Sequence, residues 1–423
     1  MKRAGVFALF FMLLVSGAAG CIRQPEAEVP AVRQVPPAAE EETVGEEQTE
    51  PGEPKQEDKP EQAEPEIPED AEEPEAEEED VLREPEIPQK ELPKVKGIYI
   101  TGPMAGHEGM ADREQLAADT ELNAMVIDIK NDEGIVTYKM SQPMVEELGA
   151  GVAYIQDLPE LMGRLKGQDL YLIARIVAFK DPLLAEKHPE LCIRKRDGSV
   201  FRDKNGLPWV NPYEEEVWEY LTALGKEAAG AGFDEIQFDY IRFPTEISDE
   251  EADYGPKAQG KSKTDIITEF TAYVYEQLSP LGVQVSADVF GTVIDNEDDG
   301  ALVGQDYGAM ARHLDYICPM VYPSHYRDGV YGIEHPDLMP YETVAAALKA
   351  SGEVLDGIPE GEHRAIVRPW LQDFTAVWIS HHQSYGGSQI RQQIQAVYDS
   401  GCEEWLLWNA KCSYTPEGLL SED

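Results

Sequence analysis

The segment Asp234-Glu235-Ile236-Gln237-Phe238-Asp239-Tyr240-Ile241-Arg242 shows the pattern that decides the fold. Its apolar residues predict a buried β-strand, and charged side chains appear where the strand ends. Side chains alternate along a strand, so Gln237 and Asp239 share one face while Phe238 and Tyr240 share the other. The aromatic face suits packing against helices. The polar face is therefore expected to point into the interior of the fold.

The same kind of apolar run recurs along the chain and alternates with amphipathic helical patterns. The runs lie at 97–100, 124–129, 171–177, 235–241, 283–289, 316–322, 364–370 and 404–408. Helical patterns between them include 214–229, 265–278, 341–355 and 388–399. This alternation predicts an α/β fold, a (β/α)8 TIM barrel. A doubly wound open sheet is the alternative, but no glycine-rich phosphate loop follows the first strand.

The N-terminal residues predict an exported lipoprotein. Lys2 and Arg3 precede an apolar run at 6–15, and small residues then lead to Cys21. That run is far shorter than the ~20 residues needed to span a bilayer, so we interpret 1–21 as a cleaved signal peptide with a lipobox cysteine. Ordinary secretion is the alternative. We expect a lipid on Cys21 to anchor the chain in the cell membrane, on its extracytoplasmic side.

The acidic stretch that follows, 22–93, is rich in Glu and Pro and predicts a disordered linker. The barrel is expected over 94–423. The formal net charge of the chain is −47, which excludes a nucleic-acid partner, because phosphate binding depends on clustered Lys and Arg. The acidic surface suits a neutral or cationic substrate better than a polyanion.

Motifs for metal and redox chemistry are missing from the sequence. Besides Cys21 the chain has Cys192, Cys318, Cys402 and Cys412, without a CxxC pair, and their spacing leaves disulfide pairing open. There is no HExxH or GxSxG motif, so we expect no metal and no cofactor. We interpret the loop 295–300 as a solvated acidic loop rather than a calcium site, and His381 and His382 as solvated surface residues.

Carboxylates at the ends of predicted strands mark the candidate site, because these ends meet at the active-site face of a barrel. Asp128, Asp239 and Asp288 follow this rule. A buried Arg175 needs anionic partners, and the carboxylates of the second and fourth strands are the nearest candidates. Neighbouring strands lie ~4.8 Å apart, so Asp239 and Asp288 could approach the ~5–5.5 Å separation of a retaining glycosidase.

Aromatic residues near the same strand ends suggest a carbohydrate ligand, since sugar rings stack on aromatic faces. They are Tyr322, Tyr326, Trp370, Phe374, Trp405 and Trp408. The loop 322–326 also carries His325, and we interpret it as part of a substrate pocket. Trp218, on a predicted helix, is expected to be a core residue.

Four segments resemble the motifs of a bacterial family of predicted glycoside hydrolases in the TIM-barrel glycosidase superfamily. They are 234–244 (DEIQFDYIRFP), 286–291 (SADVFG), 319–326 (PMVYPSHY) and 368–374 (RPWLQDF). The resemblance extends from Val95 to Tyr414. By similarity to barrel glycosidases, it implies that Asp239 is the nucleophile and Asp288 the general acid/base.

The sequence therefore predicts a retaining glycoside hydrolase that acts on a cell-envelope or extracellular polysaccharide. Arg242 or Arg175 would keep Asp239 ionised. The residues expected to bind substrate are Asp128, Arg175, Gln237, Arg242, Tyr322, His325, Trp370, Gln372 and Asp373. A non-catalytic, carbohydrate-binding barrel is the alternative function, and an inverting enzyme is the alternative mechanism.

Overall fold

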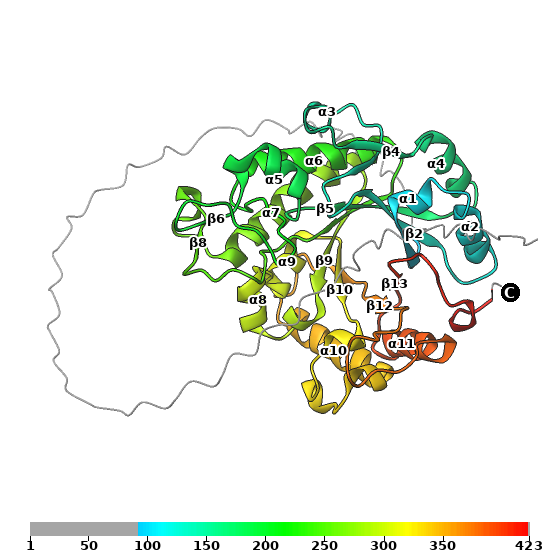
Figure 1. Cartoon of the computed structure of the whole chain (residues 1–423). Coiled ribbons are helices and arrows are strands. Elements are labelled where there is room, and N and C mark those ends of the chain that lie inside the picture. Colours follow the sequence, from blue (N-terminus) through cyan, green and yellow to red (C-terminus); the bar gives the residue numbers. More distant parts are fainter. Residues whose placement is uncertain (1–91, 422–423) are drawn as a thin grey trace, which may run out of the picture. The chain divides into compact units, whose positions relative to one another are not determined.

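Parallel strands close into a barrel in the computed structural model, which describes residues 92–421 (Figure 1). The first barrel strand pairs with both the second and the last, so the sheet has no open edge at this point. The predicted (β/α)8 barrel is thus confirmed. In chain order its strands are β1 (Lys96–Ile100), β2 (Ala124–Lys130), β5 (Tyr171–Val177), β7 (Glu235–Asp239), β9 (Gln284–Phe290), β10 (Tyr316–Met320), β12 (Trp370–Gln372) and β13 (Trp405–Trp408).

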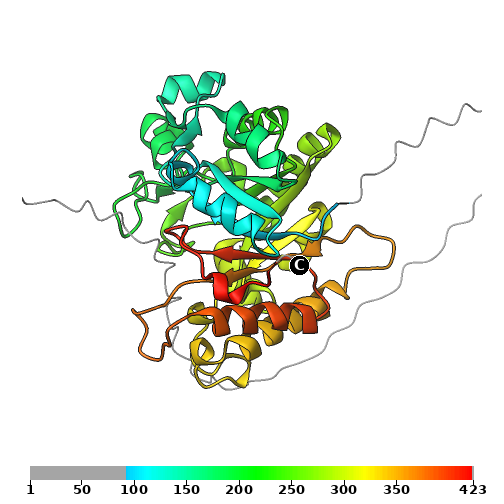
Figure 2. The same cartoon turned by 90° about the vertical axis from the view of Figure 1, so that its right-hand side faces the viewer.

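Helices connect successive strands and surround the barrel (Figures 1 and 2). Helices α10 and α11, which precede the last two barrel strands, lie side by side on one flank of the barrel. The connecting helices are α2 (Met110–Ala118), α4 (Leu158–Lys166), α6 (Glu215–Gly230), α7 (Lys263–Leu278), α8 (Glu297–Val303), α9 (Tyr307–Met310), α10 (Pro340–Leu355) and α11 (Gly387–Asp399).

Smaller elements decorate the loops between these main elements. Strands β3 (Val136–Tyr138) and β4 (Gly151–Ile155) extend the sheet beyond β2, and β6 (Arg194–Lys195) pairs with β8 (Ala252–Asp253) in a separate ribbon. Short helices are α1 (Gly102–Ala105), α3 (Pro143–Leu148) and α5 (Pro182–Lys187). The 3-10 turns are η1 (Pro189–Leu191), η2 (Pro256–Ala258), η3 (Ser279–Leu281), η4 (Gly291–Val293), η5 (Ala311–His313), η6 (Pro323–His325), η7 (Val330–Gly332), η8 (Pro336–Leu338) and η9 (Pro416–Gly418).

Two apolar layers hold the barrel together. The outer layer lies between strands and helices, where Phe238 packs edge-on against Phe270 of α7. The inner layer fills the barrel, and it includes Tyr99, Tyr316 and Trp370. Every residue of β2 and β5 is buried, as expected for parallel strands that are covered on both faces.

The seventh predicted strand, 364–370, differs from the structure. It is split into β11 (Ile366–Val367), which pairs with the start of β10, and β12. Pro369 lies between the two pieces and has no N–H to donate, so the regular ladder is interrupted there. The split shifts the strand end from Trp370 to Gln372.

The acidic loop and the cysteines behave as structural elements. Asn296 caps the N-terminus of α8, and Asp306 caps α9, so the predicted solvated loop serves helix capping. The four cysteines within the described range, Cys192, Cys318, Cys402 and Cys412, are free thiols. Cys318 is buried inside the barrel.

The predicted signal peptide, Cys21 and residues 22–91 of the linker lie outside the described residues. Within 92–421, no helix has both the length and the apolar character to cross a membrane.

Candidate active site

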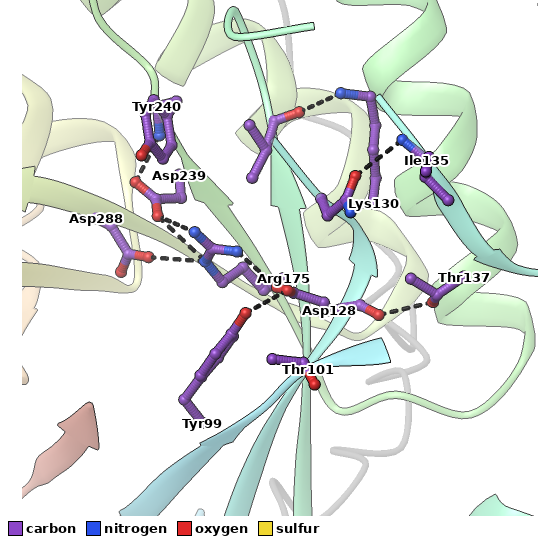
Figure 3. A network of polar contacts seen from close by, with 12 residues as sticks. Tyr99, Thr101, Asp128, Lys130, Ile135, Thr137, Arg175, Asp239, Tyr240 and Asp288 are labelled. Atoms are coloured by element: carbon purple, nitrogen blue, oxygen red, sulfur yellow. Dashed lines mark hydrogen bonds and ion pairs between the residues drawn. The ribbon is translucent and has the colours of Figure 1, made fainter. Parts of the chain in front are cut away.

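Charged side chains from adjacent strands meet around Arg175 at the C-terminal end of the barrel (Figure 3). The guanidinium Nη1 of Arg175 donates to Oδ1 of Asp128 at 2.5 Å. Its Nε and Nη2 both donate to Oδ2 of Asp239, the former at 3.1 Å. The prediction that Arg175 pairs with carboxylates of the second and fourth strands is confirmed. One cation, Arg175, therefore bridges the carboxylates of Asp128 and Asp239.

Asp239 is held at both carboxylate oxygens. Oδ2 faces Arg175, and Oδ1 accepts a 2.6 Å hydrogen bond from the backbone N–H of Tyr240. Tyr240 has a φ of +52°, a left-handed conformation that is uncommon for a residue other than glycine. This conformation ends β7 at Asp239, two residues earlier than predicted. Strained backbone next to a reactive side chain is typical of functional sites.

Asp288, at the end of β9, is almost completely buried and lies next to the same guanidinium. Its Oδ2 is 3.9 Å from Nε of Arg175, and its Oδ1 accepts a 2.7 Å hydrogen bond from the indole Nε1 of Trp370. Burial raises the pKa of Asp288 well above its ordinary value, and the negative charge of nearby Asp239 raises it further. Asp288 therefore favours the protonated form.

Asp128 has a different environment. Besides Arg175, it accepts a hydrogen bond from the hydroxyl of Tyr99, and Thr137 donates to its backbone carbonyl (Figure 3). Burial raises the pKa of Asp128, while Arg175 and the Tyr99 hydrogen bond oppose that rise. All these contacts are internal, so Asp128 positions Arg175 from the side opposite to Asp239.

Tyr99, which the sequence analysis did not single out, lies against Arg175 together with Trp408, one of the aromatic residues expected near the strand ends. Their rings stack with centroids 4.1 Å apart, and the guanidinium carbon of Arg175 lies 5.4 Å from each ring centroid. The sequence pattern could have indicated Tyr99, because it alternates with Ile98 and Ile100 on β1 and so lies on the opposite face of that strand. An aromatic residue on the inward face of a barrel strand is a candidate for contact with the site.

Aromatic rings lead from the carboxylates toward the surface. Tyr322 lies in the inner layer of the barrel, and burial together with the negative charges of Asp288 and Asp239 raises its pKa. The Tyr322 ring packs edge-on against His325, with centroids 5.2 Å apart. His325 lies 6.2 Å from Phe374, which stacks on Trp378 at 5.9 Å. We call Tyr322, His325, Phe374 and Trp378 the aromatic ladder.

The outer end of the ladder is open to solvent. Trp378 is 55% exposed, and its neighbour Val377 is 70% exposed. At the inner end, burial lowers the pKa of His325 to about 4, so its imidazole is neutral near neutral pH. The side chain of Ser324 lies 3.0 Å from His325 Nδ1. The predicted loop thus places Tyr322 in the inner layer of the barrel and packs His325 against it.

Two predicted substrate ligands, Gln372 and Asp373, are engaged within the protein instead. Gln372 is fully buried, accepts a hydrogen bond from the Ser324 N–H and donates to Asp337 and the Phe374 carbonyl. Both carboxylate oxygens of Asp373 accept hydrogen bonds from Thr415. Within the fold they hold the loop of η6 and the C-terminal segment in place, and their contact with substrate stays a prediction.

Gln237 also lies away from the reacting groups. It is fully buried and directs its amide nitrogen toward the sulfur of Cys318, 3.5 Å away. Glu235, Gln237 and Asp239 alternate on the inner face of β7, so Gln237 forms the layer beneath Asp239. Gln237 therefore packs in the barrel interior, one layer further from the active-site end than Asp239.

Arg242 was the alternative to Arg175 for keeping Asp239 ionised, and its contact with substrate stays a prediction. Its guanidinium donates to its neighbour's carbonyl, Phe243 O, and lies over the rings of Trp209, Tyr240 and Phe290, 4.6–5.0 Å from their centroids. Burial lowers the pKa of Arg242. Arg175 is the cation that contacts Asp239.

A second buried ionic network lies at the opposite end of the barrel. Arg368 donates from Nη1 to both carboxylate oxygens of Glu235 at 2.8 Å and from Nε to Glu404 at 2.8 Å. Glu235 begins β7, whereas Asp239 ends it. Arg368 is therefore a structural residue at the stability face of the barrel, and it takes no part in the cluster of Asp239 and Asp288.

The cluster combines two neighbouring carboxyl groups in different surroundings. Asp239 forms an ion pair with Arg175, while burial and the charge of Asp239 raise the pKa of Asp288. Glycoside hydrolysis requires two carboxyl groups, one of them a proton donor, and an arrangement of this kind can provide them.

Comparison with protein families agrees with this chemistry. Residues 97–414 match the family model described as "putative glycosyl hydrolase domain". The chain belongs to this glycosyl hydrolase family. The match covers the whole barrel and the residues around Arg175, and its extent agrees with the resemblance noted from the sequence motifs.

Comparison with solved structures finds similar chains. A hypothetical protein from Ruminiclostridium thermocellum ATCC 27405 is 41% identical and covers 45% of this chain and 97% of its own, with a TM-score of 0.42. The glycoside hydrolase domain of PgaB (BpsB) from Bordetella bronchiseptica is 14% identical over 76% of this chain and 95% of its own, with a TM-score of 0.54.

A β-galactosidase from the psychrophilic Marinomonas ef1 is 12% identical over 74% of this chain and 53% of its own, with a TM-score of 0.52. At 14% and 12% identity, the Bordetella and Marinomonas structures show the shared barrel alone. No curated protein matches the chain.

Proposed function

We propose that this protein is a retaining glycoside hydrolase in which Asp239 is the nucleophile and Asp288 the general acid/base. The observation that carries the proposal is that Arg175 contacts the two carboxyl groups unequally. This guanidinium donates twice to Asp239 but lies 3.9 Å from Asp288, whose pKa is raised by burial and by the charge of Asp239.

The reaction takes place in two steps. In the first, Asp239 attacks the anomeric carbon, the glycosidic bond breaks, and Asp288 transfers its proton to the leaving oxygen. In the second, Asp288 removes a proton from water, the water oxygen attacks the anomeric carbon, and Asp239 is released. Asp288 ends protonated again, so the cycle is balanced.

Two features support this geometry. Strands β7 and β9 are parallel and pair Phe238 with Ala287, and Asp239 and Asp288 are the next residues on the two strands. Neighbouring strands lie ~4.8 Å apart, which is close to the ~5–5.5 Å between the two carboxyl groups of retaining enzymes. An inverting enzyme needs a wider gap, because a water molecule must fit beside the sugar.

The substrate we propose is a neutral or cationic polysaccharide of the cell envelope or extracellular matrix. The outer end of the aromatic ladder supports this, because the indole of Trp378 is 55% exposed and offers a surface on which a sugar ring can stack. The net charge of −47 opposes polyanionic glycans.

We also propose that the protein is exported and anchored through a lipid on Cys21. The signal-like residues 1–20 and the Glu- and Pro-rich stretch 22–93 support this. A flexible tether of that length has a root-mean-square reach of roughly 45–50 Å. The barrel would then search the polymer next to the membrane.

A glycan-panel hydrolysis screen tests the proposal. The purified chain should release sugar from at least one neutral or cationic glycan, and Asp239→Asn and Asp288→Asn should abolish release. Asp298→Asn, an exposed carboxylate in α8, is the matched control and should retain full activity. Binding without turnover by the unmodified chain would instead establish a non-catalytic carbohydrate-binding barrel.

The roles of the two aspartates are tested separately. A fluoro-sugar that traps the glycosyl-enzyme should label Asp239, and azide should rescue Asp239→Gly by forming a glycosyl azide. The stereochemistry of the first product, followed by NMR, distinguishes retention from inversion. Label on any other residue, or an inverted first product, would overturn the assignment.

A further inference from the structure

A histidine–aspartate cluster lies on two loops at the active-site end of the barrel. Asp328 and His335 belong to the loop between β10 and α10, and His381 belongs to the loop between β12 and α11. Nδ1 of His335 lies 3.1 Å from Oδ2 of Asp328, and Nδ1 of His381 lies 3.0 Å from the same oxygen. The two imidazole rings stack with centroids 3.7 Å apart.

We propose that Asp328, His335 and His381 bind one divalent transition-metal ion of the Zn²⁺ class. Each residue offers one ligand atom, and the three atoms lie within 4.8 Å of one another. An ion about 2.0–2.2 Å from two nitrogens and one oxygen fits between atoms at this spacing. Two imidazoles and a carboxylate form a ligand set that favours Zn²⁺ over Ca²⁺ or Mg²⁺, which prefer oxygen ligands.

The backbone around the cluster is already held in place. Asp337, two residues after His335, is buried and accepts hydrogen bonds from the Gln383 N–H and from the Gln372 side chain. Gln383, two residues after His381, also donates from its amide to the Asp337 carbonyl at 2.7 Å. The two loops are therefore joined next to the ligands, which reduces the ordering needed for metal binding.

The surroundings allow an ion to enter. The side chains of Asp328 and His381 are more than half exposed, so an ion can reach them and a water molecule can complete a tetrahedral shell.

The bound ion would fasten the loop that carries His325 to the loop that carries Phe374 and Trp378. The sequence did not reveal this site, because its ligands come from separate loops, and His381 was predicted to be merely solvated. The assignment revises the expectation that the protein binds no metal. It is independent of the glycosidase chemistry, since none of its ligands contacts Asp239 or Asp288 in the hydrogen bonds and ion pairs of the described residues.

Zinc binding by the full chain tests the proposal. The chain is stripped with a chelator, dialysed against Zn²⁺, and analysed for metal content and for its melting temperature. We expect one ion per chain and a Zn²⁺-dependent rise in Tm. His335→Gln and His381→Gln should each weaken zinc affinity by at least about tenfold and abolish the rise in Tm.

Two substitutions serve as controls. His382→Gln changes an exposed histidine beside His381, and His188→Gln changes a histidine that lies within 3.2 Å of two glutamates. Both should bind zinc as the unmodified chain does. Co²⁺ replacement should give a spectrum without thiolate charge-transfer absorption, which excludes cysteine ligands. Absence of zinc from the unmodified chain, or unchanged binding in both ligand variants, would overturn the proposal.

Discussion

The indole Nε1 of Trp370 donates a 2.7 Å hydrogen bond to Oδ1 of Asp288. This bond favours the charged form of the carboxyl group and so lowers the pKa of Asp288 against the larger effects of burial and Asp239. Trp370 is thus a positioning residue that also sets the pH range of the proposed acid/base.

Replacing this tryptophan should move the pH profile of the enzyme. Trp370→Phe removes the N–H donor, so the pKa of Asp288 rises further. The general acid must be protonated, and the alkaline limb of kcat/KM should therefore move to higher pH. Initial rates across a pH series measure this shift. Trp218→Phe, in the helical layer, is the control, and equal profiles in both variants would contradict the role given to Trp370.

Asp288→Asn should separate activity from stability. Loss of the proton donor should reduce kcat/KM by about 10²–10⁴-fold on natural substrates. The folded-state pKa of Asp288 is raised, so its protonation stabilises the fold at low pH, and that contribution is lost as pH rises through the raised pKa. The variant keeps an oxygen for the Trp370 hydrogen bond but cannot ionise.

Chemical denaturation as a function of pH checks this second effect. The free energy of unfolding of the unmodified chain should fall relative to that of Asp288→Asn as pH rises through that pKa. Parallel curves for the two proteins would mean that the pKa of Asp288 is not raised in the folded state.

Arg175→Met should strongly destabilise the protein. It leaves Asp128 and Asp239 buried without their cation, and breaking such a buried pair costs about 3–5 kcal/mol. Urea titration measures the loss, which should shrink at acidic pH, where the carboxylates take up protons. Arg368→Met provides the comparison. It should destabilise the barrel by a similar amount, but it should leave the pH profile of residual activity unchanged.

Trp378→Ala tests the outer end of the aromatic ladder. Loss of a stacking surface worth about 0.5–1.5 kcal/mol should raise KM roughly two- to tenfold and leave kcat nearly unchanged. Trp378 is 55% exposed, so the stability should change by less than about 0.5 kcal/mol. Steady-state kinetics on a long oligosaccharide should show the effect. Val377→Ala is the control, and a loss confined to kcat would place Trp378 in another role.

Cys21→Ser tests the proposed anchor. The variant cannot be acylated, so the exported protein should move from the membrane fraction to the soluble extracytoplasmic fraction. Fractionation followed by immunoblotting measures the distribution. Cys402→Ser, within the barrel, should not change it. Membrane association that persists in Cys21→Ser would show that another segment holds the protein there.

The strands and helices of the barrel could be predicted from the sequence because their period is local. The run 171–177 coincides with β5, and the pattern 388–399 differs from α11 by one residue. The split at Pro369 was missed because an apolar run does not reveal where hydrogen bonding is interrupted. The contacts of Arg175 were predictable because a buried cation must have an anionic partner.

Residues after the strands were harder to assign. Gln372 and Asp373 follow β12 as site residues would, but their partners, Ser324, Asp337 and Thr415, are distant in sequence. Arg368 and Arg175 look alike, since each lies near an apolar run, yet they lie at opposite ends of the barrel. Only the position along the strand distinguishes them, and this depends on where each strand begins.

The ionic network of Glu235, Arg368 and Glu404 affects which mutations the barrel can accept during evolution. It secures the strand starts without using any residue that surrounds Asp239 and Asp288. Mutations at the active-site end can therefore alter reactivity or specificity while the ion pairs at the strand starts remain intact. Because stability and reactivity depend on separate residues, substitutions in the loops can produce new specificities without preventing the protein from folding.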